Sequence, residues 1–241
     1  MCHRARVMKP GQIDDSFRLS ARHTDAIDAR HVIQVKDINI AAVVRPVGKA
    51  DASLMLQQCR PSLCRNDKTS GIEVNGQPEG VYMVTSGIHA NGGCCFDFGN
   101  AETNSRDDGN GHMDAIRLMC GKPCNPHVGL DMENGVYPGL PVTTGLPFVT
   151  ALGANDGQKK YQVYWGNAQV GGLATTGLLP LLSKSYTPMR QEGAILLGIG
   201  GDNSNASLGS FFEGVMTAGF PSPATMNEVQ TNVISVGYAA P

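Results

Sequence analysis

The sequence predicts an all-β protein, a β-sandwich of the jelly-roll kind. Glycine and proline are abundant, with 30 Gly and 14 Pro in 241 residues, and turn formers favour sheets over helix bundles. Short apolar runs alternate with glycine and asparagine clusters, a spacing typical of sandwiches. Hydrophobic residues reach 41% and charged residues only 17%, which provides a core and argues against disorder. At this length a single domain is favoured.

The expected strands follow a polar, unpatterned segment at residues 1–30. Residues 31–47 are rich in β-branched side chains, which predicts a strand. Eight further runs after Gly80 are expected to form strands: VYMVTSGIH, MDAIRLM, VGLDMENGVY, LPFVTAL, YQVYW, GAILLGIG, FFEGVMTAG and VISVGY.

One helix is predicted near the C-terminal end. Ser222 can cap it and Pro223 suits its first position. Met226, Val229 and Val233 then recur at helical spacing.

Charge and hydropathy exclude two classes of partner. The net charge of −2 leaves no basic excess to neutralise phosphates, so nucleic-acid binding is not expected. No run approaches the roughly 18 apolar residues of a membrane helix, so no membrane span is expected. The first residues are basic without an apolar stretch behind them, and they do not form a secretory signal.

Cysteine spacing nevertheless indicates an exported protein. Seven cysteines are unusual in a reducing cytosol. Close pairs predict local disulfides, and buried free thiols are the alternative. Zinc is less favoured because no CxxC pair is present, and no metal or other cofactor is expected. The pairs are Cys59 and Cys64, Cys94 and Cys95, and Cys120 and Cys124, with Cys2 left over.

Residues 92–114 form the densest polar segment. Residues 108–111 imitate a calcium loop, but Arg106 and Arg117 take the first and twelfth positions, where carboxylates are required, so an EF-hand is rejected. Adjacent Cys94 and Cys95 can pair only through a strained ring, which indicates a site that benefits from it, such as a ligand platform. Two unrelated thiols are the alternative.

Acidic residues suggest sugar chemistry. If VGLDMENGVY is a strand, Asp131 and Glu133 share one face about 7 Å apart, opposite a core face of Val128, Leu130 and Met132. Paired acids of this kind are the working groups of glycosidases, and a solvated edge strand is the alternative.

A third carboxylate, Asp202, follows an apolar strand at residues 194–199 and the pair Gly200–Gly201. Paired glycines let the backbone approach a ligand, and the neighbouring Asn and Ser side chains can bond hydroxyls. A simple turn at a strand end is the alternative.

Together these segments resemble the catalytic domain of family 54 glycoside hydrolases, the fungal and bacterial α-L-arabinofuranosidases. The resemblance implies a sandwich of the jelly-roll, concanavalin or LamG-like type over residues 31–241, with residues 1–30 unassigned. It rests on QPEGVYMVTSGIHANGGCCFDFGNAETNSRDDGNGHMDAI, LDMENGVYPG, WGNA and QEGAILLGIGGDNSNASLGSFFEGVMTAGFPS.

The resemblance also implies a retaining mechanism and roles for particular residues. Glu133 matches the nucleophile, and Asp202 matches the general acid/base. A Cys94–Cys95 disulfide is implied to pack against the arabinofuranose, and Cys59–Cys64 is similar to an early disulfide hairpin. The implied substrate-binding positions are Cys94, Cys95, Asp131, Asn134 and Gly201.

Three departures from the family pattern make this an apparently partial catalytic domain. No tryptophan stands in residues 119–127, where the family places one, and Cys120 and Cys124 are hypothesised to staple a shortened loop there. Residues 1–30 do not resemble the opening strands, and several strands are missing between Cys64 and Arg65. The family's arabinose-binding second domain is also absent.

The sequence therefore predicts a secreted, monomeric enzyme that releases terminal α-L-arabinofuranosyl residues from arabinan or arabinoxylan. Its expected partners are polysaccharide or oligosaccharide substrates, with no nucleic acid and no membrane. A catalytically impaired carbohydrate-binding relic of the family is the main alternative, and an adhesive sandwich is a third. Intact Glu133 and Asp202 favour the enzyme, whereas the missing strands and tryptophan favour the relic.

Overall fold

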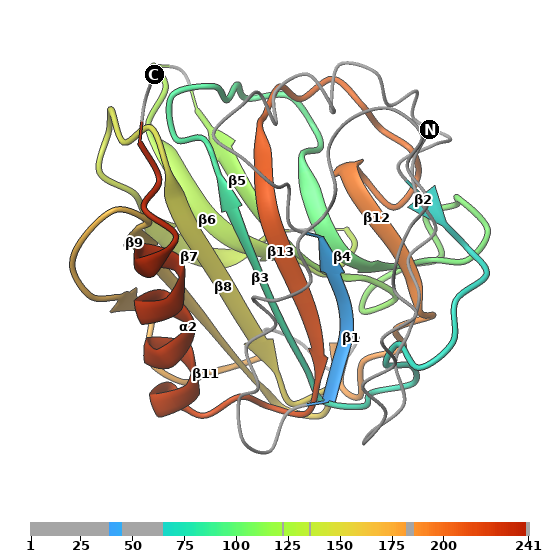
Figure 1. The fold of residues 1–241 in the computed structure, drawn as a ribbon. Coiled ribbons are helices and arrows are strands. Elements are labelled where there is room, and N and C mark those ends of the chain that lie inside the picture. Colours follow the sequence, from blue (N-terminus) through green and yellow to red (C-terminus); the bar gives the residue numbers. More distant parts are fainter. Residues whose placement is uncertain (1–38, 45–64, 122, 135, 182–185, 240–241) are drawn as a thin grey trace, which may run out of the picture.

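The computed structural model is a β-sandwich of two antiparallel sheets with a helix against one of them (Figure 1). The predicted all-β sandwich is therefore confirmed. The residues that the structure describes are 39–44, 65–121, 123–134, 136–181 and 186–239.

The first sheet has the strand order β1-β13-β3-β8-β9-β10, with β11 also paired to β9. Its strands are β1 (Asn39–Val44), β3 (Glu79–Thr85), β8 (Val149–Asn155), β9 (Lys160–Asn167), β10 (Ala174–Thr175), β11 (Leu179–Pro180) and β13 (Phe211–Ala218).

The second sheet has the order β2-β12-β4-β5-β6-β7. Its strands are β2 (Arg65–Asn66), β4 (Asp97–Ala101), β5 (Asp114–Cys120), β6 (Pro126–Asp131), β7 (Val136–Pro141) and β12 (Ala194–Ile199). No strand was predicted over β4, because glycine and asparagine interrupt its apolar pattern.

The main core lies between the sheets, because side chains alternate between the two faces of a strand. Met83 of β3 and Ala151 of β8 belong to the same buried cluster as Ile116 of β5 and Leu130 of β6. The outer face of each sheet therefore lies outside this core.

The helix α2 (Pro223–Ser235) covers the outer face of the first sheet (Figure 1). The Ser222 side chain accepts a hydrogen bond from the Thr225 N–H at 3.2 Å, as the capping prediction requires. Because α2 includes Val233, the prediction of a strand over VISVGY is wrong. Burial of Val233 against the sheet outweighs the weak strand preference of its β-branched side chain.

Several predictions concern residues outside the described part of the chain. Only Asn39–Val44 of the predicted strand at 31–47 is described, as β1. Cys2, Cys59 and Cys64 all lie outside, and so does the Cys59–Cys64 hypothesis. Within the described residues, no helix has the length and apolar character to cross a membrane.

Candidate active site

Polar side chains gather on the outer face of the second sheet. Phe98 and Ile116 point into the core, so the residues beside them in sequence, Asp97 and Arg117, point outward. Asp97 and Arg117 are direct cross-strand partners on β4 and β5. Asp131 is the last residue of β6, the next strand in the sheet. Three neighbouring strands therefore contribute charges to one buried patch.

The segment around Glu133 is a turn, which corrects the expectation of one continuous strand. Strand β6 ends at Asp131 and β7 begins at Val136. Glu133 and Asn134 have φ values of 69° and 52°, in the left-handed region that non-glycine residues seldom occupy. The strand-based face relation of Asp131 and Glu133 is therefore wrong, although Val128, Leu130 and Met132 do lie in the core.

Four hydrogen bonds hold this turn. The Glu133 N–H donates to Asp131 Oδ1 at 3.1 Å, and the Tyr186 hydroxyl donates to the Glu133 carbonyl at 2.8 Å. The Asn134 amide donates to Asp107 Oδ1 at 3.1 Å, and the Gly111 N–H donates to the Met132 carbonyl at 2.8 Å. The polar loop at residues 107–111 thus supports the turn. A backbone fixed in this strained region is common at functional sites.

Asp202 lies in a second turn, directly after β12. The Ser204 N–H donates to Asp202 Oδ1 at 2.8 Å, and the Gly200 N–H donates to the Ser204 carbonyl at 2.9 Å. A side chain at Gly201 would collide with the buried carboxylate of Glu102. Glycine is therefore required where this turn packs on the sheet, and Asp202 stays exposed.

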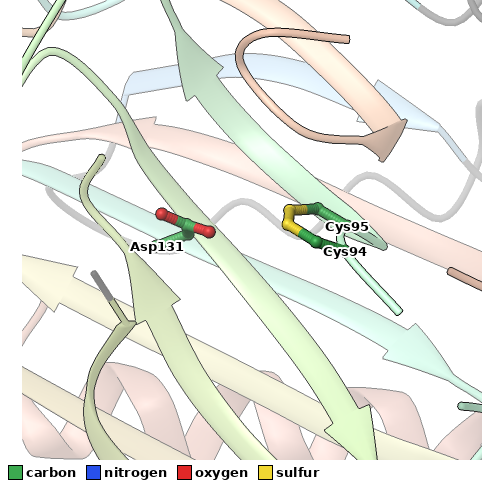
Figure 2. A group of neighbouring side chains, drawn as sticks. All are labelled: Cys94, Cys95 and Asp131. Carbon is green, nitrogen blue, oxygen red and sulfur yellow. A yellow bond between two sulfur atoms is a disulfide. The ribbon is translucent and has the colours of Figure 1, made fainter. Parts of the chain in front are cut away.

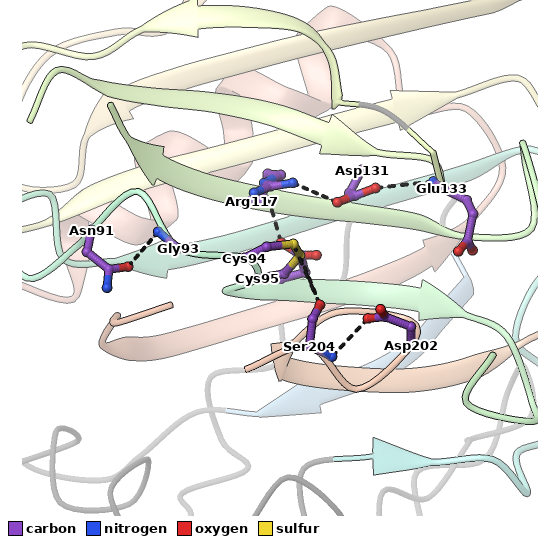
Figure 3. The surroundings of a disulfide bond; sticks show 10 residues. Asn91, Gly93, Cys94, Cys95, Arg117, Asp131, Glu133, Asp202 and Ser204 are labelled. Carbon is purple, nitrogen blue, oxygen red and sulfur yellow. Dashed lines mark hydrogen bonds and ion pairs between the residues drawn. A yellow bond between two sulfur atoms is a disulfide. The ribbon is translucent and has the colours of Figure 1, made fainter. Parts of the chain in front are cut away.

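Cys94 and Cys95 are joined by a disulfide that lies between the two turns (Figure 3). Cys94 is exposed while Cys95 is buried, so one side of the disulfide remains accessible. The Ser204 hydroxyl lies 3.6 and 3.5 Å from their sulfur atoms. Asn91 ties the flanking loops together by accepting from the Gly93 N–H at 3.1 Å and donating to the Ala206 carbonyl at 3.1 Å.

Asp131 adjoins this disulfide (Figure 2). The two sulfur atoms and a carboxylate oxygen of Asp131 all lie within 4.8 Å of one another. Because the sulfurs are bonded to each other, neither is the thiolate that binds metal ions. The group instead combines an apolar surface, the disulfide, with a hydrogen-bond acceptor, the Asp131 carboxylate.

The predicted catalytic carboxyl groups differ in environment. Glu133 is 5% exposed, and burial raises its pKa to about 7, with the charges of Asp202 and Glu192 adding to the rise and Arg65 opposing it. Hydrogen bonds from Ser204 lower the pKa of Asp202 below its usual value. The pKa of Glu133 therefore lies well above that of Asp202.

A second disulfide joins Cys120 and Cys124. It closes the loop between β5 and β6, where the shortened loop was hypothesised. This loop adjoins the segment that carries the Cys94–Cys95 disulfide, because the Cys120 N–H donates to the Asn91 carbonyl at 3.1 Å.

The structure thus brings together Cys94, Cys95, Asp131, Glu133 and Asp202, and it places Asn134 and Gly201 on the same two turns. Sequence reasoning missed several supporting residues. Alternation in FDF and AIRLM could have placed Asp97 and Arg117 on the outer face. Ser204 follows Asp202 by two residues, the spacing of an Asx-turn, so its backbone contact has a local signal. No local signal points to Tyr186 as a partner of the Glu133 turn.

Comparison with known proteins identifies the family. A family model described as "Alpha-L-arabinofuranosidase B, catalytic" matches residues 35–239. The chain belongs to this family.

Relatives with curated names are consistent with it. An α-L-arabinofuranosidase of Hypocrea jecorina is 48% identical over 191 residues, which are 73% of this chain and 38% of that protein. An arabinofuranosidase/β-xylosidase of Trichoderma koningii matches over the same shares at 48% identity. A probable α-L-arabinofuranosidase B of Aspergillus fumigatus is 45% identical over 190 residues, 73% of this chain and 37% of that protein. The chain spans under two fifths of these relatives' length.

Solved structures agree with the fold. A mutant GH54 α-L-arabinofuranosidase soaked with 4-nitrophenyl α-L-arabinofuranoside superposes with a TM-score of 0.69 at 39% identity, covering 73% of this chain and 40% of the other. An arabinofuranosidase complexed with arabinofuranosyl-α-1,2-xylobiose gives the same score and identity, covering 73% and 39%. The family resemblance inferred from the sequence motifs is confirmed.

Proposed function

We propose that this protein is a retaining glycoside hydrolase that releases terminal α-L-arabinofuranosyl residues from arabinan- or arabinoxylan-type chains. The observation that carries the proposal is the placement of Glu133 and Asp202 on the two turns that flank the Cys94–Cys95 disulfide (Figure 3), in a chain of the arabinofuranosidase B family. The protein acts on polysaccharides or oligosaccharides as a monomer outside the cell, where disulfides persist.

In this proposal the two carboxyl groups divide the chemistry. Glu133 attacks the anomeric carbon while Asp202 gives its proton to the departing glycosidic oxygen. Asp202 then takes a proton from water, and the water oxygen displaces Glu133 from the glycosyl-enzyme. Such a double displacement retains configuration and requires carboxyl groups about 5–5.5 Å apart.

In this proposal substrate binding also moves a proton from Glu133 to Asp202. In the free site the raised pKa of Glu133 and the lowered pKa of Asp202 place the proton on Glu133. A bound sugar shields the exposed Asp202 from water, which raises its pKa. Developing positive charge at the anomeric carbon favours ionised Glu133. The proton therefore transfers to Asp202 as the reaction begins.

The remaining positions bind the sugar. Asp131 and Asn134 bond ring hydroxyls, and the backbone at Gly201 approaches the sugar where no side chain intervenes. The Cys94–Cys95 disulfide packs against one face of the furanose ring. The relic alternative is not favoured, because both carboxyl groups are retained and stand in one site.

Hydrolysis of 4-nitrophenyl α-L-arabinofuranoside by the purified chain tests the proposal. Release of nitrophenol is expected, with at least a ~10³-fold loss of kcat in Glu133→Gln, because an amide cannot form the glycosyl-enzyme. The β-linked arabinoside is the control for anomer choice. The β-xyloside is the control for sugar choice, which the bifunctional name of the Trichoderma koningii relative makes relevant. Equal rates for the wild type and Glu133→Gln would refute the proposal.

A further inference from the structure

One buried cation lies beneath the candidate sugar site. The Arg117 side chain is 5% exposed, and its Nη1 donates to Asp131 Oδ2 at 2.7 Å. Its Nε lies 3.6 Å from Asp97 Oδ1, where the carboxylate is fully buried. Figure 3 shows Arg117 bonded to Asp131, which in turn bonds Glu133. Neither Arg117 nor Asp97 has a part in the proposed chemistry.

Two carboxyl groups compete for this single guanidinium, and their surroundings decide which keeps the charge. Each oxygen of Asp131 accepts a hydrogen bond, one from Arg117 and the other from the Glu133 N–H. Neither oxygen of Asp97 has a hydrogen-bond partner. Burial, followed by the neighbouring charge of Asp131, raises the pKa of Asp97 well above its usual value. Burial also raises the pKa of Asp131, but Arg117 and the Glu133 N–H stabilise its ionised form, so the negative charge is favoured on Asp131 over Asp97.

Arg117 is thus the first member of a chain of contacts that ends at the candidate nucleophile. Its Nη1 holds one oxygen of the Asp131 carboxylate while its Nε faces Asp97, and the other oxygen of Asp131 anchors the strained turn at Glu133. A buried guanidinium with two acidic neighbours is stable only in a defined geometry, because leaving either charge unpaired is costly.

We infer that Arg117 is a positioning residue for the sugar site: it holds Asp131 in the orientation that binds a sugar hydroxyl and, through Asp131, fixes the backbone of Glu133. The inference rests on the proposed function, because it assigns Asp131 to substrate binding. It predicts that Arg117 acts on the substrate only through Asp131.

A double-mutant cycle tests this dependence. Kinetic constants for 4-nitrophenyl α-L-arabinofuranoside are measured for the wild type, Arg117→Lys, Asp131→Asn and the double variant. Lysine keeps the charge but not the fork, so Arg117→Lys should lower kcat/KM by about 10- to 100-fold, the cost of a misplaced site group. The double variant should match Asp131→Asn within about twofold, because Arg117 has no other route to the substrate.

Two results would overturn the inference: an unchanged kcat/KM in Arg117→Lys, or losses that multiply in the double variant. Tyr82→Phe is the matched control, because it removes a buried hydroxyl from the opposite sheet and should leave kcat/KM unchanged. A wild-type chain that releases no nitrophenol would instead refute the proposed function. These failures are therefore distinguishable.

A second variant covers the case in which Arg117→Lys does not fold. Asp97→Asn with Arg117→Gln removes both members of the deeper ion pair, so that Asp131 is the one carboxyl group left in the cluster and the introduced glutamine amide can still donate a hydrogen bond to it. When this variant is combined with Asp131→Asn, kcat/KM is again expected to match that of Asp131→Asn alone. Multiplied losses there would overturn the inference.

Discussion

Two groups of buried carboxyl groups in this protein are stabilised in different ways. The site-face cluster (Asp97, Arg117 and Asp131) contains a cation and borders the turn of Glu133. The inter-sheet cluster (Glu73, Glu79 and Asp114) lies at one end of the sandwich and, in the described part of the chain, has no ion-pair partner.

In the inter-sheet cluster, the cost of burying carboxyl groups is reduced by an amide hydrogen bond and by protonation. The Asn100 amide donates to Glu79 Oε2 at 2.9 Å and to the Glu73 carbonyl at 2.7 Å. Burial, then the charge of Asp114, raises the pKa of Glu79 well above its usual value, and burial raises that of Asp114 to about 7. The comparison teaches that a carboxylate keeps its charge where a guanidinium bonds it, as Asp131 does, whereas burial favours the neutral form where only amides are present.

The largest expected effect is a loss of catalytic rate when Asp202 of the candidate active site is replaced. Asp202→Asn should lower kcat about 10²- to 10⁴-fold for substrates with poor leaving groups, because a general acid contributes that much. Aryl substrates should lose less, since a good leaving group needs little protonation. Parallel assays on 4-nitrophenyl α-L-arabinofuranoside and arabinan check this, and equal losses on both would contradict the acid role.

The next expected effect is on stability rather than activity, and the residue to be replaced is Asp114 of the inter-sheet cluster. Asp114 is protonated in the fold below about pH 7 and ionised in the unfolded chain above about pH 4. The contribution of Asp114 to the free energy of unfolding therefore falls as pH rises from about 4 to about 7, and it does not recover at higher pH. Asp114→Asn should recover up to about 4 kcal/mol at pH 8, with kcat/KM unchanged. Urea unfolding at pH 5 and 8 checks it. The prediction fails if both proteins show the same pH dependence.

Loss of the Cys94–Cys95 disulfide should affect binding and leave stability nearly intact. Replacing both Cys94 and Cys95 by alanine removes a bond that closes almost no loop, so little chain entropy is involved. We expect KM for the arabinoside to rise about tenfold, the order expected for losing a buried apolar contact, with an unchanged Tm. Peptide mapping without reductant checks the bond itself, and free thiols at both positions would contradict the idea.

The smallest expected effect is a change in pH profile. Because the pKa of Glu133 is raised to about 7 and that of Asp202 is lowered, the site carries one proton between these two values. The profile of kcat/KM should therefore be bell-shaped, with its basic limb near pH 7 and its acidic limb below the usual Asp value. Ser204→Ala removes the side-chain hydrogen bond that most lowers the pKa of Asp202. The acidic limb should then move to higher pH while the basic limb stays near 7. An unmoved acidic limb would show that Ser204 does not control Asp202.

Local signals in the sequence determined the sandwich, the strand at 194–199, the capped helix after Ser222, and the motifs of the family. Each depends on residues near one another in the chain, such as an apolar alternation, a cap or a glycine pair. For the same reason the sequence misjudged the segment around Glu133, where a strand-like run proved to be a turn, and the VISVGY segment, whose first three residues form the end of the helix.

Only the tertiary structure decided how the site is held. Asp97, Arg117 and Asp131 come from three strands, and Tyr186 comes from a loop far from Glu133 in sequence, so no spacing rule links them. Their pKa values and hydrogen bonds depend on burial and on neighbours across strands, and both arise only when the two sheets pack. The sequence could name the carboxyl groups, but long-range packing set their protonation and orientation.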